Sequence, residues 1–272
     1  MKAWSKRAIA FAGAMLLGAG AGGAMRAPLE LGESGRVERV VDGDTLYLEG
    51  GLKVRLAAMD APEMPPSRAR RTGAMDGPYA EQSKAALIAI TDNRRVGLYY
   101  GGARRDRYKR ALAQVYTLDA AGNKDVWAQQ EMVKLGMARV YTWPDTYQDT
   151  AKLYAAEREA RAAGRGIWAD DYYAIRGPSP DDLAQDVDSF QLVEGIITSA
   201  ANVRGMTYLN FGASYKTDFT ITVNKKSKKR FDAAGIDLLA LEGARVRVRG
   251  WIELHNGPAI WLDHPERLEV LD

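Results

Sequence analysis

Two short acidic runs decide how the first half of this chain folds: Val41-Asp42-Gly43-Asp44-Thr45 and Val54-Arg55-Leu56-Ala57-Ala58-Met59-Asp60-Ala61-Pro62-Glu63. Asp-Gly and Gly-Gly pairs between short alternating runs are strong hairpin signals, and Gly50-Gly51 stands between the two acidic runs. The sequence therefore predicts a β-meander over residues 36–58. Such a meander brings both acidic turns to one end of the sheet.

The rest of the first half predicts two more strands and three helices. Strands are expected at residues 95–100 and 111–117, and helices at residues 80–90, 126–135 and 151–163. Five short strands interleaved with three helices favour a small β-barrel with helices packed on it (an α+β protein) over an alternating parallel sheet.

The acidic turns suggest a cation site. Asp42, Asp44, Asp60 and Glu63 would share one rim, and four carboxylates together are costly unless a divalent metal or several arginines neutralise them. Oxygen ligands without His or Cys favour calcium, or less favourably magnesium, over zinc. Both histidines lie far away, so a carboxylate or a metal-activated water must act as the base. The alternative is that the two runs are only a hairpin turn and a strand exit.

A basic loop and three aromatic residues could bind a polyanion. Residues 104–110 carry five positive charges around Tyr108, which suits phosphate binding, although a solvated hairpin loop has the same composition. Tyr108, Tyr141 and Trp143 are candidates for stacking on bases, while Tyr141 and Trp143 could instead belong partly to the core.

The second half predicts a separate β domain. Gly177-Pro178-Ser179-Pro180 and the acids after it indicate a linker at residues 176–188 between domains at residues 34–175 and 189–272. Strands at residues 191–200, 207–211, 218–223, 246–253 and 258–262, with a helix near residues 229–234, suggest a second, smaller OB-like barrel. This half shows no catalytic constellation, and its two histidines are assigned structural or surface roles.

The N-terminus predicts export. Lys2, Lys6 and Arg7 precede a ten-residue apolar run and the small residues Ala19-Gly20-Ala21, which is typical of a cleaved signal peptide over residues 1–24. The run is short for a membrane span, so a periplasmic or secreted protein is expected, with an uncleaved anchor as the alternative. No Cys is present, which excludes disulfides and Cys nucleophiles.

Five segments together resemble the staphylococcal nuclease (thermonuclease) family over residues 34–172. They are the two acidic runs, residues 106–113, the helix end at residues 132–138 and Gly166-Ile167-Trp168. The resemblance implies an OB-type five-stranded barrel with three helices. It also implies a calcium-dependent endonuclease that cuts DNA and RNA and leaves 3′-phosphorylated products. A catalytically silent nucleic-acid-binding module on the same fold is the alternative.

The resemblance also implies a role for each site residue. Asp44, Asp60 and the main-chain carbonyl of Ala61 would hold the metal, with Asp42 in or near its surroundings. Glu63 would be the general base, and Arg55 and Arg110 would clamp the phosphate. Independently of the resemblance, the basic loop makes Arg107, Tyr108 and Lys109 candidates for substrate contact, with Tyr141 and Trp143 as stacking candidates. The sequence departs from the family pattern at Ala61, which replaces a threonine, and at Lys109, which replaces a glycine.

Overall fold

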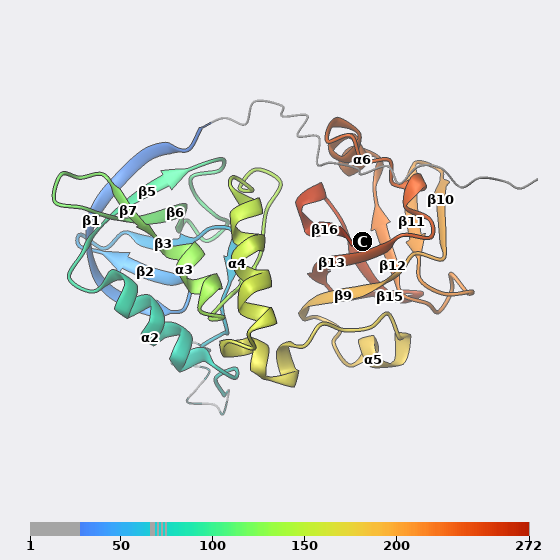
Figure 1. The fold of residues 1–272 in the computed structure, drawn as a ribbon, viewed down its shortest axis with the longest axis horizontal. Helices are drawn as coiled ribbons and strands as arrows, with labels where there is room; N and C mark the ends of the chain where they lie inside the picture. Colours follow the sequence, from blue (N-terminus) through green and yellow to red (C-terminus); the bar gives the residue numbers. More distant parts are fainter. Residues whose placement is uncertain (1–27, 66–68, 70, 72, 74, 272) are drawn as a thin grey trace, which may run out of the picture.

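The protein is described here by a computed structural model that covers residues 28–271 except 66–68, 70, 72 and 74. The predicted signal peptide, residues 1–24, lies outside the described residues. Among the described residues, no helix is both long and apolar enough to span a membrane. Two β-barrels lie side by side, and helix α4 stands between them (Figure 1).

The first barrel is closed by one parallel strand pair. Its sheet order is β3-β2-β1-β5-β6-β7, and β3 also pairs with β6, which joins the ends of the five-stranded ring. The strands are β1 (Glu30–Asp42), β2 (Thr45–Leu48), β3 (Lys53–Leu56), β5 (Arg95–Tyr100), β6 (Ala111–Leu118) and β7 (Lys124–Trp127). This order confirms the predicted OB-type barrel, and β1 begins at Glu30, before the expected domain start at residue 34.

Three helices cover this barrel, as the sequence predicts. They are α2 (Ala80–Thr91), α3 (Ala128–Lys134) and α4 (Thr150–Ala162). The expected start of the second helix at residue 126 is wrong, because residues 124–127 form strand β7 and Trp127 pairs with Tyr116. The two rings stack with their centroids 5.8 Å apart, which holds this edge in extended form. Apolar residues from the strands and helices form one core, with Leu46, Val54, Leu98 and Met132 fully buried.

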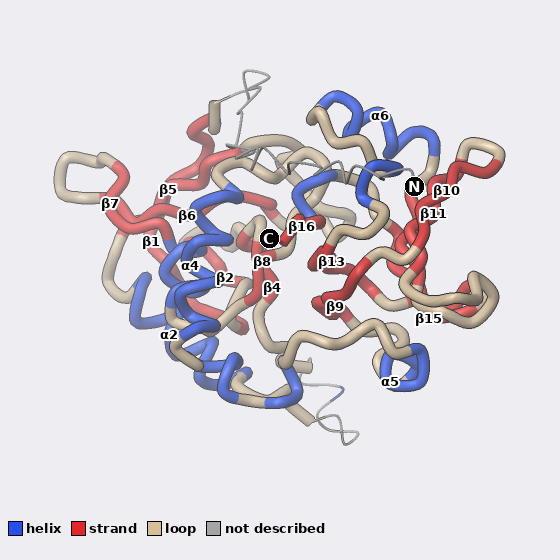
Figure 2. The backbone as a smooth tube through the Cα atoms, turned by 45° about the vertical axis from the view of Figure 1, so that its right-hand side comes forward, coloured by secondary structure: helices blue, strands red, loops and turns tan. Residues whose placement is uncertain are grey.

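A short ribbon separate from the barrel sheet carries part of the acidic rim. Strand β4 (Met59–Asp60) pairs antiparallel with β8 (Arg139–Val140), so Met59 lies opposite Val140 and Asp60 opposite Arg139. Figure 2 shows both strands between the two barrels. The β8 strand was not among the elements expected from the sequence, because two residues give no periodicity.

The second half of the chain, here called the second barrel, contains two sheets and, like the first barrel, one parallel strand pair. Its sheets have the orders β10-β11-β12-β15-β14 and β16-β13-β9, with β12 and β15 parallel and α6 between β12 and β13. The strands are β9 (Phe190–Ile196), β10 (Ser199–Val203), β11 (Met206–Asn210), β12 (Thr220–Val223), β13 (Arg245–Trp251), β14 (Glu253–His255), β15 (Gly257–Trp261) and β16 (Leu268–Leu271). The predicted OB-like character of this half agrees with these pairings.

Several boundaries in this half differ from the prediction. The strand expected over residues 191–200 is divided into β9 and β10. At the break, the Ile197 amide donates to the Ala244 carbonyl, whereas the Thr198 amide donates to the Asn210 carbonyl. Helix α6 (Lys225–Ala233) starts earlier than residue 229, since the Asn224 side chain caps it by accepting from the Ser227 amide. Strand β16 was not expected.

The predicted linker is more ordered than its composition suggests. It contains the short helix α5 (Pro180–Ala184), whose Leu183 is buried. The amide of Arg176 donates to Leu192, and Arg176 accepts from the Glu194 amide, so the segment joins the edge of β9. Nothing in these contacts fixes where one domain ends, so the predicted domain boundaries stay a prediction.

Candidate functional site

Asp44 stands in the tight turn between β1 and β2. Asp42 shapes this turn, because its Oδ1 accepts from the Asp44 amide at 3.1 Å. Asp44 is buried, and its Oδ1 accepts from Thr45 Oγ1 at 2.9 Å while Oδ2 accepts from the Ala61 amide at 3.3 Å. A Cβ at Gly43 would collide with Ser83 Oγ, so the turn needs glycine for this close approach to α2.

Arg55 on β3 connects the two acidic runs. Its Nη1 donates to the carbonyls of Leu56 at 2.7 Å and Met59 at 3.0 Å. Its Nη2 lies 2.9 Å from Asp44 Oδ2 and 3.9 Å from Asp60 Oδ1. Because one buried nitrogen contacts both carboxylates, the structure brings the two distant runs together around Arg55.

Asp60 is held from its other side by Arg139. Arg139 Nη2 lies 3.2 Å from Asp60 Oδ2, and both side chains are largely buried. Burial raises the pKa of Asp60, and the positive charges of Arg139 and Arg55 oppose that rise. Two guanidinium groups therefore fix the orientation of this carboxylate.

Glu63 and Asp44 both resist ionisation. Burial, with a further contribution from Asp42, raises the pKa of Asp44 to about 6 although Arg55 opposes it. Glu63 is more exposed, but partial burial of its carboxylate and repulsion from Asp44, Asp60 and Asp42 raise its pKa to about 7. A carboxylate with a pKa near neutrality is suited to accept and return a proton.

The acidic cluster of Asp42, Asp44, Asp60 and Glu63 suits a hard cation in its charge and donor chemistry. Its four carboxylates face the two guanidinium groups of Arg55 and Arg139, which leaves an excess of two negative charges when all ionise. In the described parts of the chain, no three acidic or histidine side chains are gathered closely enough to hold a metal alone. Calcium readily completes its shell with main-chain carbonyls and water, and the cluster supplies two carboxylates, Asp44 and Asp60, that contact the same Arg55 nitrogen.

The predicted substrate loop lies between β5 and β6 and is organised by Asp106. Asp106 Oδ1 accepts from the amides of Tyr108 at 2.8 Å and Arg110 at 3.0 Å, and Oδ2 accepts from Arg110 Nε at 2.6 Å. Lys109 adopts a positive φ of 64°, a conformation that favours glycine. The lysine that replaces glycine at this position is therefore held in a strained backbone conformation.

Arg110 engages its own loop and not the acidic cluster, because its side chain pairs with Asp106. Its main chain lies close to the cluster, since the next residue, Ala111, pairs with Val54, the neighbour of Arg55. Tyr108 is 65% exposed, and the guanidinium of Arg107 lies 4.9 Å from the centre of its ring. The guanidinium of Arg110 lies 5.4 Å from the same ring centre, so two arginines flank this exposed tyrosine.

The two remaining aromatic candidates have different surroundings. Trp143 is half-buried and lies under the Arg55 guanidinium, 6.0 Å from its ring centre. Tyr141 contacts Trp143 edge-on at 4.7 Å, but it also packs on Phe190 at 4.9 Å and under Arg267. The structure therefore places Tyr141 at the junction with the second barrel, and the predicted stacking role of both residues stays a prediction.

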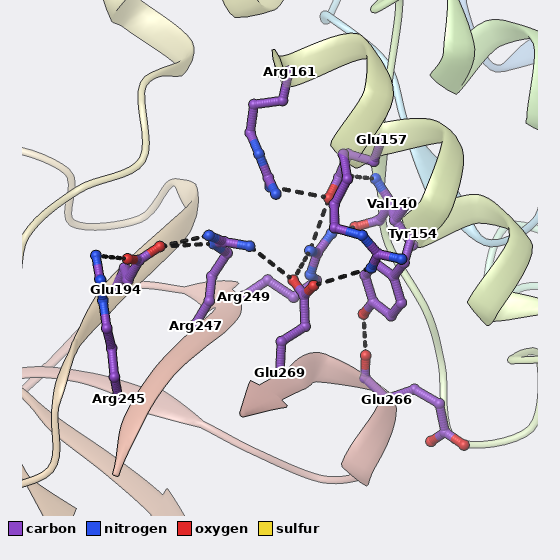
Figure 3. A network of polar contacts seen from close by, with 11 residues as sticks. Val140, Tyr154, Glu157, Arg161, Glu194, Arg245, Arg247, Arg249, Glu266 and Glu269 are labelled. Atoms are coloured by element: carbon purple, nitrogen blue, oxygen red, sulfur yellow. Dashed lines mark hydrogen bonds and ion pairs between the residues drawn. The ribbon is translucent and has the colours of Figure 1, made fainter. Parts of the chain in front are cut away.

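Sequence reasoning missed the residues that join the barrels. The most buried pair is Arg249 of β13 with Glu157 of α4, at 2.9 Å and at most 1% exposed (Figure 3). His264 is also buried, and its Nε2 lies 2.6 Å from Thr142 Oγ1, in keeping with the structural role expected of it. The only sequence signal was the charged residues inside apolar strands, such as Arg139 between Ala138 and Val140.

Comparisons with known proteins agree with this geometry. The sequence pattern of the staphylococcal nuclease homologue family matches residues 53–170. An uncharacterized endonuclease of Escherichia coli is 32% identical over 139 residues, which cover 50% of this chain and 77% of that protein. The thermonuclease of Staphylococcus intermedius is 30% identical over 140 residues, with the same coverage.

A third relative, of which a smaller part is matched, is a probable endonuclease, LCL3, of Phaeosphaeria nodorum. It is 39% identical over 121 residues, which are 43% of this chain but only 38% of the fungal protein. The chain thus spans less than half the length of this relative, and the family match leaves the second barrel outside it. On the pattern match and the extent of the bacterial similarities, the chain belongs to the staphylococcal nuclease family.

Proposed function

We propose that this protein is a calcium-dependent endonuclease that hydrolyses phosphodiester bonds of DNA and RNA with little sequence preference. The observation that carries the proposal is the meeting of Asp44, Asp60 and Arg55 beside Glu63. Relatives whose printed names are endonuclease and thermonuclease support it. Magnesium is the less favoured cation, and DNA and RNA are the expected partners.

Each site residue has a distinct task in this reaction. Glu63 accepts a proton from the attacking water, for which its pKa of about 7 is suited. Arg55 donates to the phosphate oxygens as negative charge builds on them, and Arg110 does the same when substrate draws it from Asp106. Calcium held by Asp44, Asp60 and the Ala61 carbonyl would neutralise phosphate charge.

The proton and bond changes balance as a hydrolysis. The water gives one proton to Glu63 as its oxygen forms a bond to phosphorus, the P–O5′ bond breaks, and the leaving 5′ oxygen takes an equivalent proton, so that Glu63 returns to its ionised state. The phosphate stays on the 3′ carbon. This polarity is the one implied by the family resemblance, and it forms part of the proposal.

The place of action is also part of the proposal. The basic and apolar pattern of residues 1–24 supports export with signal cleavage, to the periplasm or the medium. An uncleaved N-terminal anchor is the alternative.

A nuclease assay with a matched variant tests the activity. Purified protein is incubated with single- and double-stranded DNA and with RNA, in calcium and in chelator, and acid-soluble nucleotides are measured. Glu63→Gln should keep nucleic-acid binding and lose about 10²- to 10⁴-fold in turnover, because it cannot take the proton. Full turnover by this variant contradicts the role of Glu63, and binding without any cleavage by the unmodified chain favours the silent binding module.

A further inference from the structure

The β4–β8 ribbon, which carries Asp60, is attached to the second barrel at both residues of β8. Arg139 Nη1 donates to the main-chain carbonyl of Phe190 at 2.8 Å, at the start of β9. The carbonyl of Val140 accepts from Arg249 Nη1 at 3.0 Å. Two different strands of the second barrel therefore hold the strand that faces Asp60.

Arg139 connects the second barrel directly with the acidic cluster. One arm of its guanidinium reaches Asp60 at 3.2 Å and another reaches Phe190. The group lies 4.8 Å from the centre of the Phe190 ring and 5.3 Å from that of Tyr173. A planar fork between two acceptors and two rings leaves this side chain little freedom, and the single ammonium of lysine would not reproduce the fork or its stacking on the rings.

The junction that holds this arrangement is polar, buried and extensive. Glu157 accepts from the Val140 amide at 2.8 Å and pairs with Arg249, so α4, β8 and β13 share one network (Figure 3). Arg267 donates to the Thr142 carbonyl at 3.0 Å, and the Tyr154 hydroxyl donates to the Glu266 carbonyl. Because these buried charges have partners from both barrels, separating the two barrels would leave them unpaired, at a large cost in free energy.

We infer that the second barrel is a structural part of the active site, in which Arg139 is a positioning residue that Phe190 and Arg249 hold so that Asp60 is fixed for cation binding. Partners that orient a metal ligand typically contribute 10- to 100-fold to cation affinity or activity. The inference rests on the cation site of the proposed function, but it does not depend on cleavage of nucleic acid.

Two variants of the full-length chain test the inference. Arg139→Lys keeps the charge but replaces the two nitrogens that contact Asp60 and Phe190 by a single ammonium, and Phe190→Leu keeps the apolar bulk but removes the aromatic face. Calcium affinity is measured by titration calorimetry, and kcat and KM are measured on single-stranded DNA. Hydrogen exchange of the Tyr141 amide, which donates to Ala58 beside the ribbon, is followed in the calcium-free protein.

Arg139→Lys should weaken calcium binding about 10-fold or more and lower kcat by a similar factor, with KM for DNA unchanged. Phe190→Leu should change the same quantities in the same direction, and both variants should exchange the Tyr141 amide faster. Arg158→Lys is the matched control, because Arg158 forms a longer and more exposed contact across the junction, 3.8 Å to Glu269. Arg158→Lys should have the calcium affinity, the kcat and the Tyr141 amide exchange rate of the unmodified protein.

The outcomes separate this inference from the proposed function. Wild-type calcium affinity and amide exchange in both variants overturn the inference, as does an unmodified chain that binds no calcium. If the unmodified chain binds calcium without cleaving nucleic acid, the proposed function fails, and the calcium affinities of the variants still decide the inference. If Arg139→Lys does not fold, Phe190→Leu decides it.

Discussion

Replacing Arg249 by methionine should remove the strongest connection between the barrels. Arg249 is fully buried, and its guanidinium donates to Glu157, Glu269 and the Val140 carbonyl at 2.8–3.0 Å. Burial opposes ionisation of Glu157, but Arg249, together with the Val140 amide and Arg161, holds the pKa of Glu157 below its usual value. Methionine fills similar space without charge, so the variant leaves an ionised carboxylate buried.

The size of the effect follows from the remaining partners of Glu157. Removing one member of a buried ion pair costs about 3–5 kcal/mol. Arg161 lies 3.7 Å away and the Val140 amide still donates, so a loss near 3 kcal/mol is expected. At roughly 2–4 °C per kcal/mol, the melting temperature should fall by about 6–12 °C.

Urea unfolding followed by tryptophan fluorescence and circular dichroism measures this loss. The double variant Glu157→Gln/Arg249→Met should recover part of it, because glutamine can still accept from the Val140 amide without a charge. Arg245→Met is the matched control on the same strand, since Arg245 pairs with Glu194 while 59% exposed, and exposed pairs contribute about 0–1 kcal/mol. An Arg249→Met variant within 1 kcal/mol of wild type, or a double variant as unstable as the single one, refutes the reasoning.

Three further predictions concern the site itself. Arg55→Lys should lower kcat about 10²- to 10³-fold in the nuclease assay, because lysine cannot hold Asp44 and two carbonyls while donating to phosphate; near-normal kcat would contradict this. Tyr108→Ala should weaken binding of short single-stranded DNA by about 1–3 kcal/mol in fluorescence anisotropy, whereas Tyr215→Ala, equally exposed on the other barrel, should not. In chelator, the melting temperature should fall as the pH rises from about 4 to about 7. The reason is that the raised pKa values of Asp44 and Glu63 stabilise the folded state only while these carboxyl groups are protonated. Calcium should therefore raise the melting temperature more at pH 7.5 than at pH 5, and an equal rise at both would count against a cation at this cluster.

The second barrel changes how the site is understood. Family resemblance covers the first half, and that half supplies every predicted catalytic residue. Yet the ribbon that carries Asp60 has its outer contacts with β9 and β13 of the second half. The half that the sequence suggests is an accessory domain therefore contacts, in the structure, the ribbon that carries Asp60.

The sequence by itself determined the first barrel and the identity of the acidic cluster. Alternating strands and Asp-Gly turns are local signals, so the strands at residues 95–100 and 111–118 and the meeting of the two acidic turns could be predicted closely. Errors arose where local signals conflict, as at residues 124–127, where pairing of Trp127 with Tyr116 overrode a helical pattern.

Tertiary structure alone decided which charges meet across long separations. Arg139 reaches Asp60, 79 residues away in sequence, and Arg249 reaches Glu157, 92 residues away. It also placed Tyr141 against Phe190. The physical reason is that a buried charge is tolerated only beside its partner, and chain topology, which has no local sequence signature, determines which partner is within reach.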